Sequence, residues 1–300
     1  MHNDGIGNPS HLAGCDKKGV GMTEGNRRMV VKHNDLIRAG YKLGLNEQRL
    51  VLTCIARLDS VRGKLPTDNL FRVTADEFAD QWNMSQKKAY EALAEASDSL
   101  YERDIKLRKE KTQTRMRWVY MVKYHPGEGR VDLGFSPTVA PYLTQLRREF
   151  TSYGLDSVAG LRSAYSIRLF EMLMQWKSTG ACRITLTEFR EALELQDRYP
   201  RFVDLKRRVI DQAVNELKLK SNLEIEYDVH RKGQKPFALT FFFGENPQGT
   251  LPLDTPPQPR RRKMMSREAL KDYALPGENW PQLMDRLKRD GYQLAPERED

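Results

Sequence analysis

The stretch Val73-Thr74-Ala75-Asp76-Glu77-Phe78 returns 111 positions later as Ile184-Thr185-Leu186-Thr187-Glu188-Phe189. In each copy a β-branched residue precedes a Thr, and a Glu follows that Thr by three residues. This is the spacing of a capping box, in which the two side chains bond the free amides at the start of a helix. The repetition predicts that a strand end followed by a helix occurs twice.

Similar segments flank both copies. An apolar helical stretch precedes each, at 45–61 and at 163–176. A turn, a second helix with basic residues and a hairpin rich in Arg and Lys follow each. The predicted order is therefore helix, helix, basic helix and wing, and it occurs twice in one chain.

Hydrophobic periodicity predicts the extent of each element. In the first unit we expect helices at 35–43, 45–61, 75–82, 86–100 and 139–151, and strands at 71–73, 105–108, 116–122 and 131–135. In the second unit we expect helices at 164–176, 188–195 and 202–217, and strands at 223–229 and 237–243.

The basic helix of the second unit is amphipathic. Its apolar half is predicted to contain Phe202, Val203, Leu205, Val209, Ile210, Ala213, Val214 and Leu217, and its exposed half Arg201, Asp204, Arg207, Arg208, Asp211 and Asn215. Lys206 falls on the apolar side, which makes it the weaker candidate for an external contact.

Four regions are expected along the chain. Residues 1–30 are rich in glycine and form a flexible leader in which nothing packs, 31–150 and 151–244 form the two units, and 245–300 form a Pro-rich basic linker with a small tail. Within the tail we expect two short helices, at 266–273 and 280–289, and assign them no function.

Basic residues outnumber acidic ones by 50 to 41, giving a net charge of +9. Between Arg103 and Lys123 eight basic residues stand against two acids. One such hairpin is equally explained as a solvated edge strand that Lys and Arg protect from aggregation. Two of them in one chain favour binding to nucleic acid.

Several other classes of protein lack their signatures here. No run of about 18 apolar residues occurs, and the start of the chain is not signal-like, so we expect a cytoplasmic location. The three cysteines are far apart, which predicts neither disulfides nor a zinc site, and Cys54 is expected in the core. Phosphate-loop, dinucleotide, zinc-protease and hydrolase motifs are absent, so we expect a binding protein without cofactor or metal and not an enzyme.

Three motifs resemble the iteron-binding plasmid replication initiators. They are the opening Leu45-Asn46-Glu47-Gln48-Arg49-Leu50, the run from Ser163 to Gly180 that includes Arg168-Leu169, and above all Tyr199-Pro200-Arg201-Phe202-Val203-Asp204-Leu205-Lys206-Arg207-Arg208-Val209-Ile210. The resemblance covers about residues 30–243 and depends on spaced motifs in the family's order.

The resemblance implies an α+β fold of two tandem winged-helix domains. Monomers of this family bind direct repeats in double-stranded origin DNA, open the origin and help recruit the host initiator, helicase and chaperones. Homodimers, in equilibrium with monomers and formed largely through the N-terminal domain, repress the initiator's own promoter.

The candidate DNA-binding residues follow from the resemblance and from the basic hairpins. They are Ser85, Gln86, Lys87 and Lys88 in the first unit, Arg198, Arg201, Lys206, Arg207 and Arg208 in the second, and the hairpin cations Arg115, Arg117, Arg231 and Lys232. An arginine fork can bond guanine O6 and N7 together, whereas hairpin cations meet phosphates. We expect the second unit to carry most of the sequence specificity.

Two alternatives remain at this stage. One is a tandem winged-helix repressor that binds an operator and has no role in replication. The other is a nicking or strand-transfer enzyme with an unrecognised site, although no His-x-His pair occurs in the chain.

Overall fold

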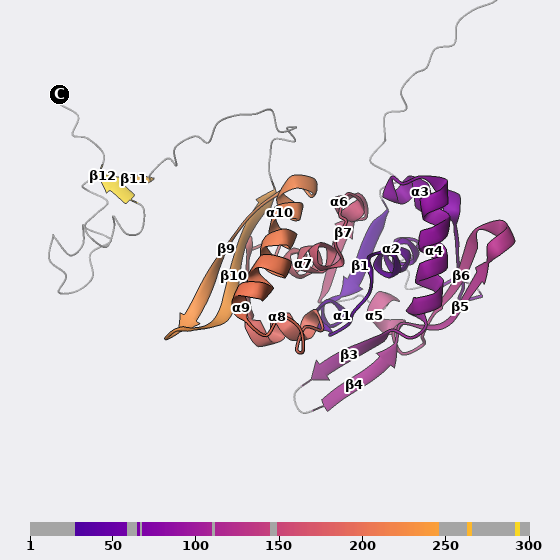
Figure 1. Ribbon diagram of the computed structural model, residues 1–300, viewed down its shortest axis with the longest axis horizontal. Helices are drawn as coiled ribbons and strands as arrows, with labels where there is room; N and C mark the ends of the chain where they lie inside the picture. Colours follow the sequence, from indigo (N-terminus) through magenta and orange to yellow (C-terminus); the bar gives the residue numbers. More distant parts are fainter. Residues whose placement is uncertain are drawn as a thin grey trace, which may run out of the picture. The chain divides into compact units, whose positions relative to one another are not determined.

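The computed structural model describes residues 28–58, 65–66, 68–109, 112–144, 149–245, 263–265 and 292–294 (Figure 1). The chain divides into two units, 1–247 and 248–300. In the part at 248–300, β11 (Lys263–Met265) pairs in parallel with β12 (Tyr292–Leu294). Most of the expected leader, the Pro-rich linker and both expected tail helices lie outside the described residues.

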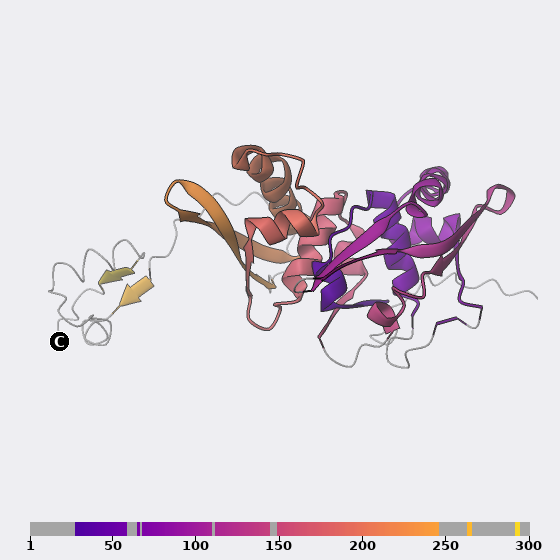
Figure 2. The same ribbon diagram turned by 90° about the horizontal axis from the view of Figure 1, so that it is seen from below.

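The part of the chain at 1–247 contains two winged-helix domains, which correspond to the two units expected from the sequence and lie next to each other (Figure 2). The first domain consists of the helices α2 (Leu45–Ile55), α3 (Ala75–Trp82) and α4 (Gln86–Leu100) and the strands β2 (Phe71–Thr74), β5 (Val119–His125) and β6 (Arg130–Phe135). The strands form an antiparallel sheet in the order β2-β6-β5.

The second domain repeats this arrangement. It consists of α7 (Ala164–Met174), β8 (Ala181–Thr185), α8 (Leu186–Ala192), α9 (Phe202–Leu205), a π-helical segment (Lys206–Ile210), α10 (Asp211–Lys220), β9 (Leu223–Lys232) and β10 (Lys235–Glu245). Its sheet order, β8-β10-β9, matches β2-β6-β5 strand for strand. The predicted internal repeat is confirmed, as is the α+β fold of two tandem winged-helix domains.

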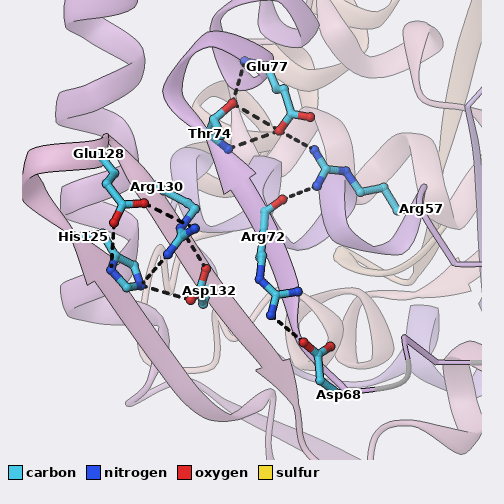
Figure 3. Close-up of polar contacts among 9 residues, drawn as sticks. All are labelled: Arg57, Asp68, Arg72, Thr74, Glu77, His125, Glu128, Arg130 and Asp132. Carbon is cyan, nitrogen blue, oxygen red and sulfur yellow. Dashed lines mark hydrogen bonds and ion pairs between the residues drawn. The ribbon is translucent and has the colours of Figure 1, made fainter.

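Both predicted capping boxes are present. Thr74 Oγ1 accepts a hydrogen bond from the Glu77 amide at 3.3 Å, and Glu77 Oε2 accepts one from the Thr74 amide at 3.2 Å (Figure 3). Thr185 and Glu188 make the same two bonds at 3.1 and 2.9 Å. Each box fixes the point at which a sheet strand becomes the second helix of its domain.

The basic hairpin at 103–123 is not the wing of the first domain, which corrects the prediction. Its strands β3 (Asp104–Lys109) and β4 (Thr112–Arg117) form a separate two-stranded sheet (Figure 1). The wing that matches β9–β10 is the following hairpin, β5–β6. The basic hairpin is thus an insertion between α4 and the wing.

Two local predictions near the domain junction are also wrong. Among the described residues of the expected helix at 139–151, α5 comprises Pro141–Thr144, whereas Phe150 and Thr151 belong to the strand β7 (Phe150–Gly154). β7 pairs with β1 (Met29–His33), in which Val30 is fully buried, so packing begins before residue 31.

The remaining helices are short. They are α1 (Asn34–Arg38), shorter than the helix expected at 35–43, and α6 (Asp156–Ala159). The expected domain boundary between residues 150 and 151 stays a prediction.

The core runs through both domains. Cys54 is completely buried, as predicted, and burial raises the pKa of its thiol to about 12. A polar network is also buried where β1 meets α7. Lys32 Nζ lies 2.6 Å from Glu171 Oε1 there, and both side chains are almost inaccessible to solvent. Among the described residues no helix is long and apolar enough to cross a membrane.

Candidate nucleic-acid interface

In the second domain one arginine bonds to the turn that precedes the basic helix. This helix comprises α9, the π-helical segment and α10 and is called the recognition helix below. Arg190, on α8, donates hydrogen bonds to the main-chain oxygens of Leu195, Arg198, Tyr199 and Pro200 at 2.7–3.4 Å. The turn needs such support, since Tyr199 has a φ of 53°, in the left-handed region that non-glycine residues rarely adopt. Burial lowers the pKa of Arg190, which nevertheless stays far above neutral pH.

Two predicted arginines share one carboxylate at the start of this helix. Arg201 Nε lies 2.8 Å from Asp204 Oδ2, and Arg207 Nη2 lies 3.6 Å from Asp204 Oδ1. The guanidinium side chains are 81% and 68% exposed, whereas that of Asp204 is 18% exposed. Asp204 therefore aligns two arginines without removing them from solvent.

Arg208 is the freest of the predicted cations on this helix. It is exposed and has no hydrogen-bond or ion-pair partner among the residues that the structure describes. Arg198, in the preceding turn, is also exposed, and its guanidinium lies 5.4 Å from the centre of the Tyr199 ring.

Lys206 is paired within the domain, although its side chain is 43% exposed. Its Nζ lies 2.9 Å from both carboxylate oxygens of Asp211, and the Tyr227 hydroxyl donates to the same carboxylate. The hydrogen bond to Asp211 raises the pKa of Lys206. This contact links the π-helical segment to β9 of the wing.

One apolar residue of the predicted helical wheel is exposed. Val203 was assigned to the apolar half, yet it is 69% exposed, whereas Leu205 and Ile210 are fully buried. Because α9 has only four residues before the π-helical segment begins, an ideal helical wheel does not describe the start of this helix.

The wing of the second domain carries the last two cations predicted there. Arg231 and Lys232 are exposed at the end of β9, next to the turn at Gly233, whose φ is 62°. Arg231 Nη1 donates to the main-chain oxygen of Gln234 at 3.0 Å and so closes the turn. Lys232 has no partner among the described side chains and main-chain groups.

In the first domain all four predicted residues lie at the exposed start of α4. Ser85 caps the helix, its hydroxyl accepting from the Lys88 amide at 3.5 Å, as predicted. Gln86 Nε2 donates to Asp76 Oδ1 at 2.6 Å, which ties α4 to α3. The ammonium groups of Lys87 and Lys88 are exposed, with no partner within the described part of the chain.

Four titratable residues near the turn of the first wing contact one another. His125, Glu128, Arg130 and Asp132 lie together at the turn between β5 and β6 (Figure 3). His125 Nε2 is 3.0 Å from Asp132 Oδ2, and Arg130 Nη1 is 3.3 Å from Glu128 Oε2. The charges at the turn of the first wing are therefore paired with each other, whereas Lys232 at the turn of the second wing has no partner among the described residues.

Arg115 and Arg117 belong to the inserted hairpin and are paired with acids at its base. Arg115 contacts Asp104, and Arg117 Nη1 lies 2.8 Å from Glu102 Oε2. The structure thus separates these two residues from the wing on which we expected them. Their contact with DNA stays a prediction, as do the contacts of the other candidates.

The other strand of this hairpin reaches the second domain. Lys106 Nζ lies 2.5 Å from Glu194 Oε2, and Arg108 pairs with Glu191. Glu191 belongs to α8, and Glu194 to the turn that follows it. The inserted hairpin is therefore an ionic link between the two domains.

Sequence reasoning missed Arg190 and the aligning role of Asp204. Arg190 has no motif of its own, because its partners are main-chain oxygens. The i, i+3 spacing of Arg201, Asp204 and Arg207 is visible in the sequence and is the signal by which their pairing could have been found. No group of three or more His, Cys, Asp or Glu suited to hold a metal occurs among the described residues.

Two exposed basic helix starts on a repeated three-helix and wing scaffold define a tandem winged-helix protein. Residues 29–174 match the family described as "Initiator Replication protein, WH1", and residues 185–243 match "Initiator Rep protein, WH2". The chain belongs to this family of replication initiators. The first match extends through α7, beyond the boundary expected at residue 150.

Individual relatives agree with this assignment. A "Replication initiation protein" of Escherichia coli is 29% identical over 221 residues, covering 71% of this chain and 68% of the relative. The "PI protein" of E. coli is 25% identical, covering 74% and 85%. Among solved structures, that of the Pi initiator protein in complex with iteron DNA has a TM-score of 0.63 and 25% identity, covering 74% of this chain and 99% of the other.

Proposed function

We propose that this protein initiates plasmid replication in the bacterial cytoplasm by binding direct repeats of double-stranded origin DNA through both winged-helix domains. The observation that carries the proposal is the pair of exposed, basic recognition-helix starts, at Lys87 and Lys88 and at Arg201, Arg207 and Arg208. The likeness to the Pi initiator, solved with iteron DNA, supports the same target class.

The two domains are proposed to make different kinds of contact with the DNA. Arginine forks at the start of the second recognition helix suit guanine edges, and each good pair contributes about 1–3 kcal/mol of discrimination. The lysines of the first domain and Lys232 of the second wing suit phosphates, which give affinity but little sequence information. Specificity is therefore expected mainly from the second domain.

Further partners follow from the family resemblance and are proposed with it. Monomers would open the origin and recruit the host initiator, helicase and chaperones, and dimers would repress the initiator's own promoter. Among the described strands β4 pairs only with β3, so its outer edge offers main-chain groups to a second copy. The protein is proposed to act by binding alone, not as an enzyme.

The test is footprinting of the full chain on the DNA that flanks its own gene, at two salt concentrations. The variant Arg207→Ala/Arg208→Ala is compared with Lys218→Ala/Lys220→Ala, which removes the same charge from the far end of the same helix. We expect protection of evenly spaced direct repeats, lost in the first variant and kept in the second.

Other footprints would support the alternatives. One palindromic footprint over a promoter indicates a repressor without a replication role. Metal-dependent cleavage of the supercoiled DNA indicates a nicking enzyme. No footprint at either salt concentration contradicts the nucleic-acid function itself.

A further inference from the structure

Val203 is an apolar residue that does not contribute to the core of its domain. It is 69% exposed on the recognition helix of the second domain, while the other valines of that helix, Val209 and Val214, are 1% and 5% exposed. A single exposed apolar residue is ordinary on a protein surface. Its neighbours give this one a specific chemical setting.

Those neighbours are the two arginines proposed to meet DNA. Residue 203 lies between Arg201 and Arg207 in the sequence, and both are bound by Asp204, the residue that follows it. The Asp204 side chain is 18% exposed, while the two guanidinium groups and Val203 are largely exposed at the same end of the helix. An apolar group thus stands in a cationic, solvent-facing cluster.

The major groove offers one kind of apolar partner to such a group. Base edges there present hydrogen-bond donors and acceptors, and the 5-methyl group of thymine is the exception. Resting on the proposed function, we propose that Val203 is a specificity-determining residue that contacts a thymine methyl group in the repeat. The arginines on either side would meet the adjacent bases or phosphates.

The inference makes the recognition sequence partly dependent on a methyl group and not only on hydrogen bonds. Burial of one methyl-sized group contributes an affinity factor of about three to five. Uracil carries the same hydrogen-bonding groups as thymine but lacks the methyl. Replacing thymine by uracil therefore isolates the proposed contact from every other feature of the base.

The experiment measures competition binding of the full chain to the footprinted repeat, with each thymine of either strand replaced in turn by uracil. Wild type is compared with Val203→Ala and with Leu219→Ala, since Leu219 is another exposed apolar residue, 76% exposed, on α10 of the same domain. Competitor DNA of unrelated sequence measures the non-specific affinity of each variant.

We expect wild type to lose affinity about three- to fivefold at one or two uracil positions. Val203→Ala should bind the thymine repeat more weakly by a similar factor and be insensitive to uracil at those positions. Leu219→Ala should behave as wild type does. Unfolding curves of the three proteins establish that folding is not the cause.

Two results overturn the inference. Either wild type is insensitive to uracil at every position, or Val203→Ala keeps the full wild-type sensitivity. In both cases repeat-specific binding of wild type would leave the proposed function intact. Failure of wild type to prefer the repeat over unrelated DNA would contradict the proposed function instead.

Discussion

Arg190 determines the shape of the turn before the second recognition helix through bonds to four main-chain oxygens. Lysine keeps the charge but cannot present several donors in a fixed plane. We expect Arg190→Lys to lower the free energy of unfolding by about 1–3 kcal/mol, because carbonyl groups lose charged donors. Specific DNA binding should weaken more than non-specific binding, since the helix start is displaced while the charge stays.

Urea unfolding and competition binding measure the two effects. Arg198→Ala is the control for stability, because Arg198 is exposed and its guanidinium lies over the neighbouring Tyr199 ring. Its unfolding free energy should change by less than about 0.5 kcal/mol. Equal stability of Arg190→Lys and wild type would show that the turn does not depend on the guanidinium.

At the scale of elements, the two basic hairpins differ in how their charges are used. Lys232, at the tip of the second wing, has no partner among the described residues, whereas Arg115, in the inserted hairpin, pairs with Asp104. A cation that neutralises one phosphate contributes about 0.9 to the slope of log affinity against log salt. Lys232→Ala should therefore reduce the slope by about one.

We expect a smaller change for Arg115→Ala, since its charge is already compensated by Asp104. Filter binding or fluorescence anisotropy at salt concentrations between about 50 and 200 mM measures both slopes. An equal reduction for the two variants would instead support the original prediction that both hairpins contact phosphates.

The segment after α1 packs closely against the second domain at Gly40, a residue that also exchanges main-chain hydrogen bonds with Lys106 of the inserted hairpin. A Cβ at this position would lie 2.6 Å from Glu194 Oε1 and 2.8 Å from the main-chain oxygen of Glu191. The glutamate side chain can move, but the main-chain oxygen cannot move without α8. Gly40→Ala should therefore destabilise the fold by about 1–3 kcal/mol.

Urea unfolding measures this loss. Gly127→Ala is the matched control, because a Cβ there meets nothing within 4 Å. A loss confined to Gly40→Ala supports close contact between the domains. Equal, small effects of both substitutions would show that the domains separate easily at this point.

The elements differ in how well the sequence predicted them. The bounds of α3 and α4 were predicted correctly, because capping boxes, Ser85 and apolar spacing are local signals. The expected helix at 139–151 was wrong because Phe150–Gly154 pairs with β1, a partner far earlier in the chain. No local pattern shows such a partner.

The candidate site was predictable to a similar degree. Exposed cations at the helix starts follow from charge and periodicity. Compensation of Arg115 and the contacts of Arg190 depend on tertiary neighbours, and the exposure of Val203 depends on the π-helical segment. These three features needed the structure.

At the scale of the whole molecule, a buried charged network around Glu171 connects segments that are far apart in the sequence, where β1 meets α7. Lys32, Arg168, Tyr41 and Tyr153 all direct donors at its carboxylate, at 2.6–3.3 Å. Burial alone would raise the pKa of Glu171, but the nearby Lys32 and Arg168 outweigh it and lower the pKa below the ordinary value. The ionised form is thus favoured by folding.

A pKa lowered in the folded state fixes the sign of the pH dependence. The stabilisation is present above the unfolded pKa of about 4.3 and is lost as the pH falls through the lower folded value. Glu171→Gln should cost about 3–5 kcal/mol at pH 7, because Lys32 and Arg168 are left without their buried counter-charge. The difference from wild type should shrink in acid.

Unfolding free energies at neutral and acid pH check this prediction. Tyr153→Phe removes one hydrogen bond and no charge, so it should cost only about 1 kcal/mol at neutral pH and show little dependence on pH in acid. A Glu171→Gln deficit that does not change with pH would mean that the loss comes from packing and not from charge.

The turn bound by Arg190 is defined by main-chain oxygens, which remain in place when side chains are exchanged. Arg201, Val203, Arg207 and Arg208 can therefore be replaced one at a time while the domain keeps its geometry. On the proposed function, two replicons whose proteins diverge only at these positions would cease to recognise each other's origins. Such replicons could then be inherited side by side in one cell.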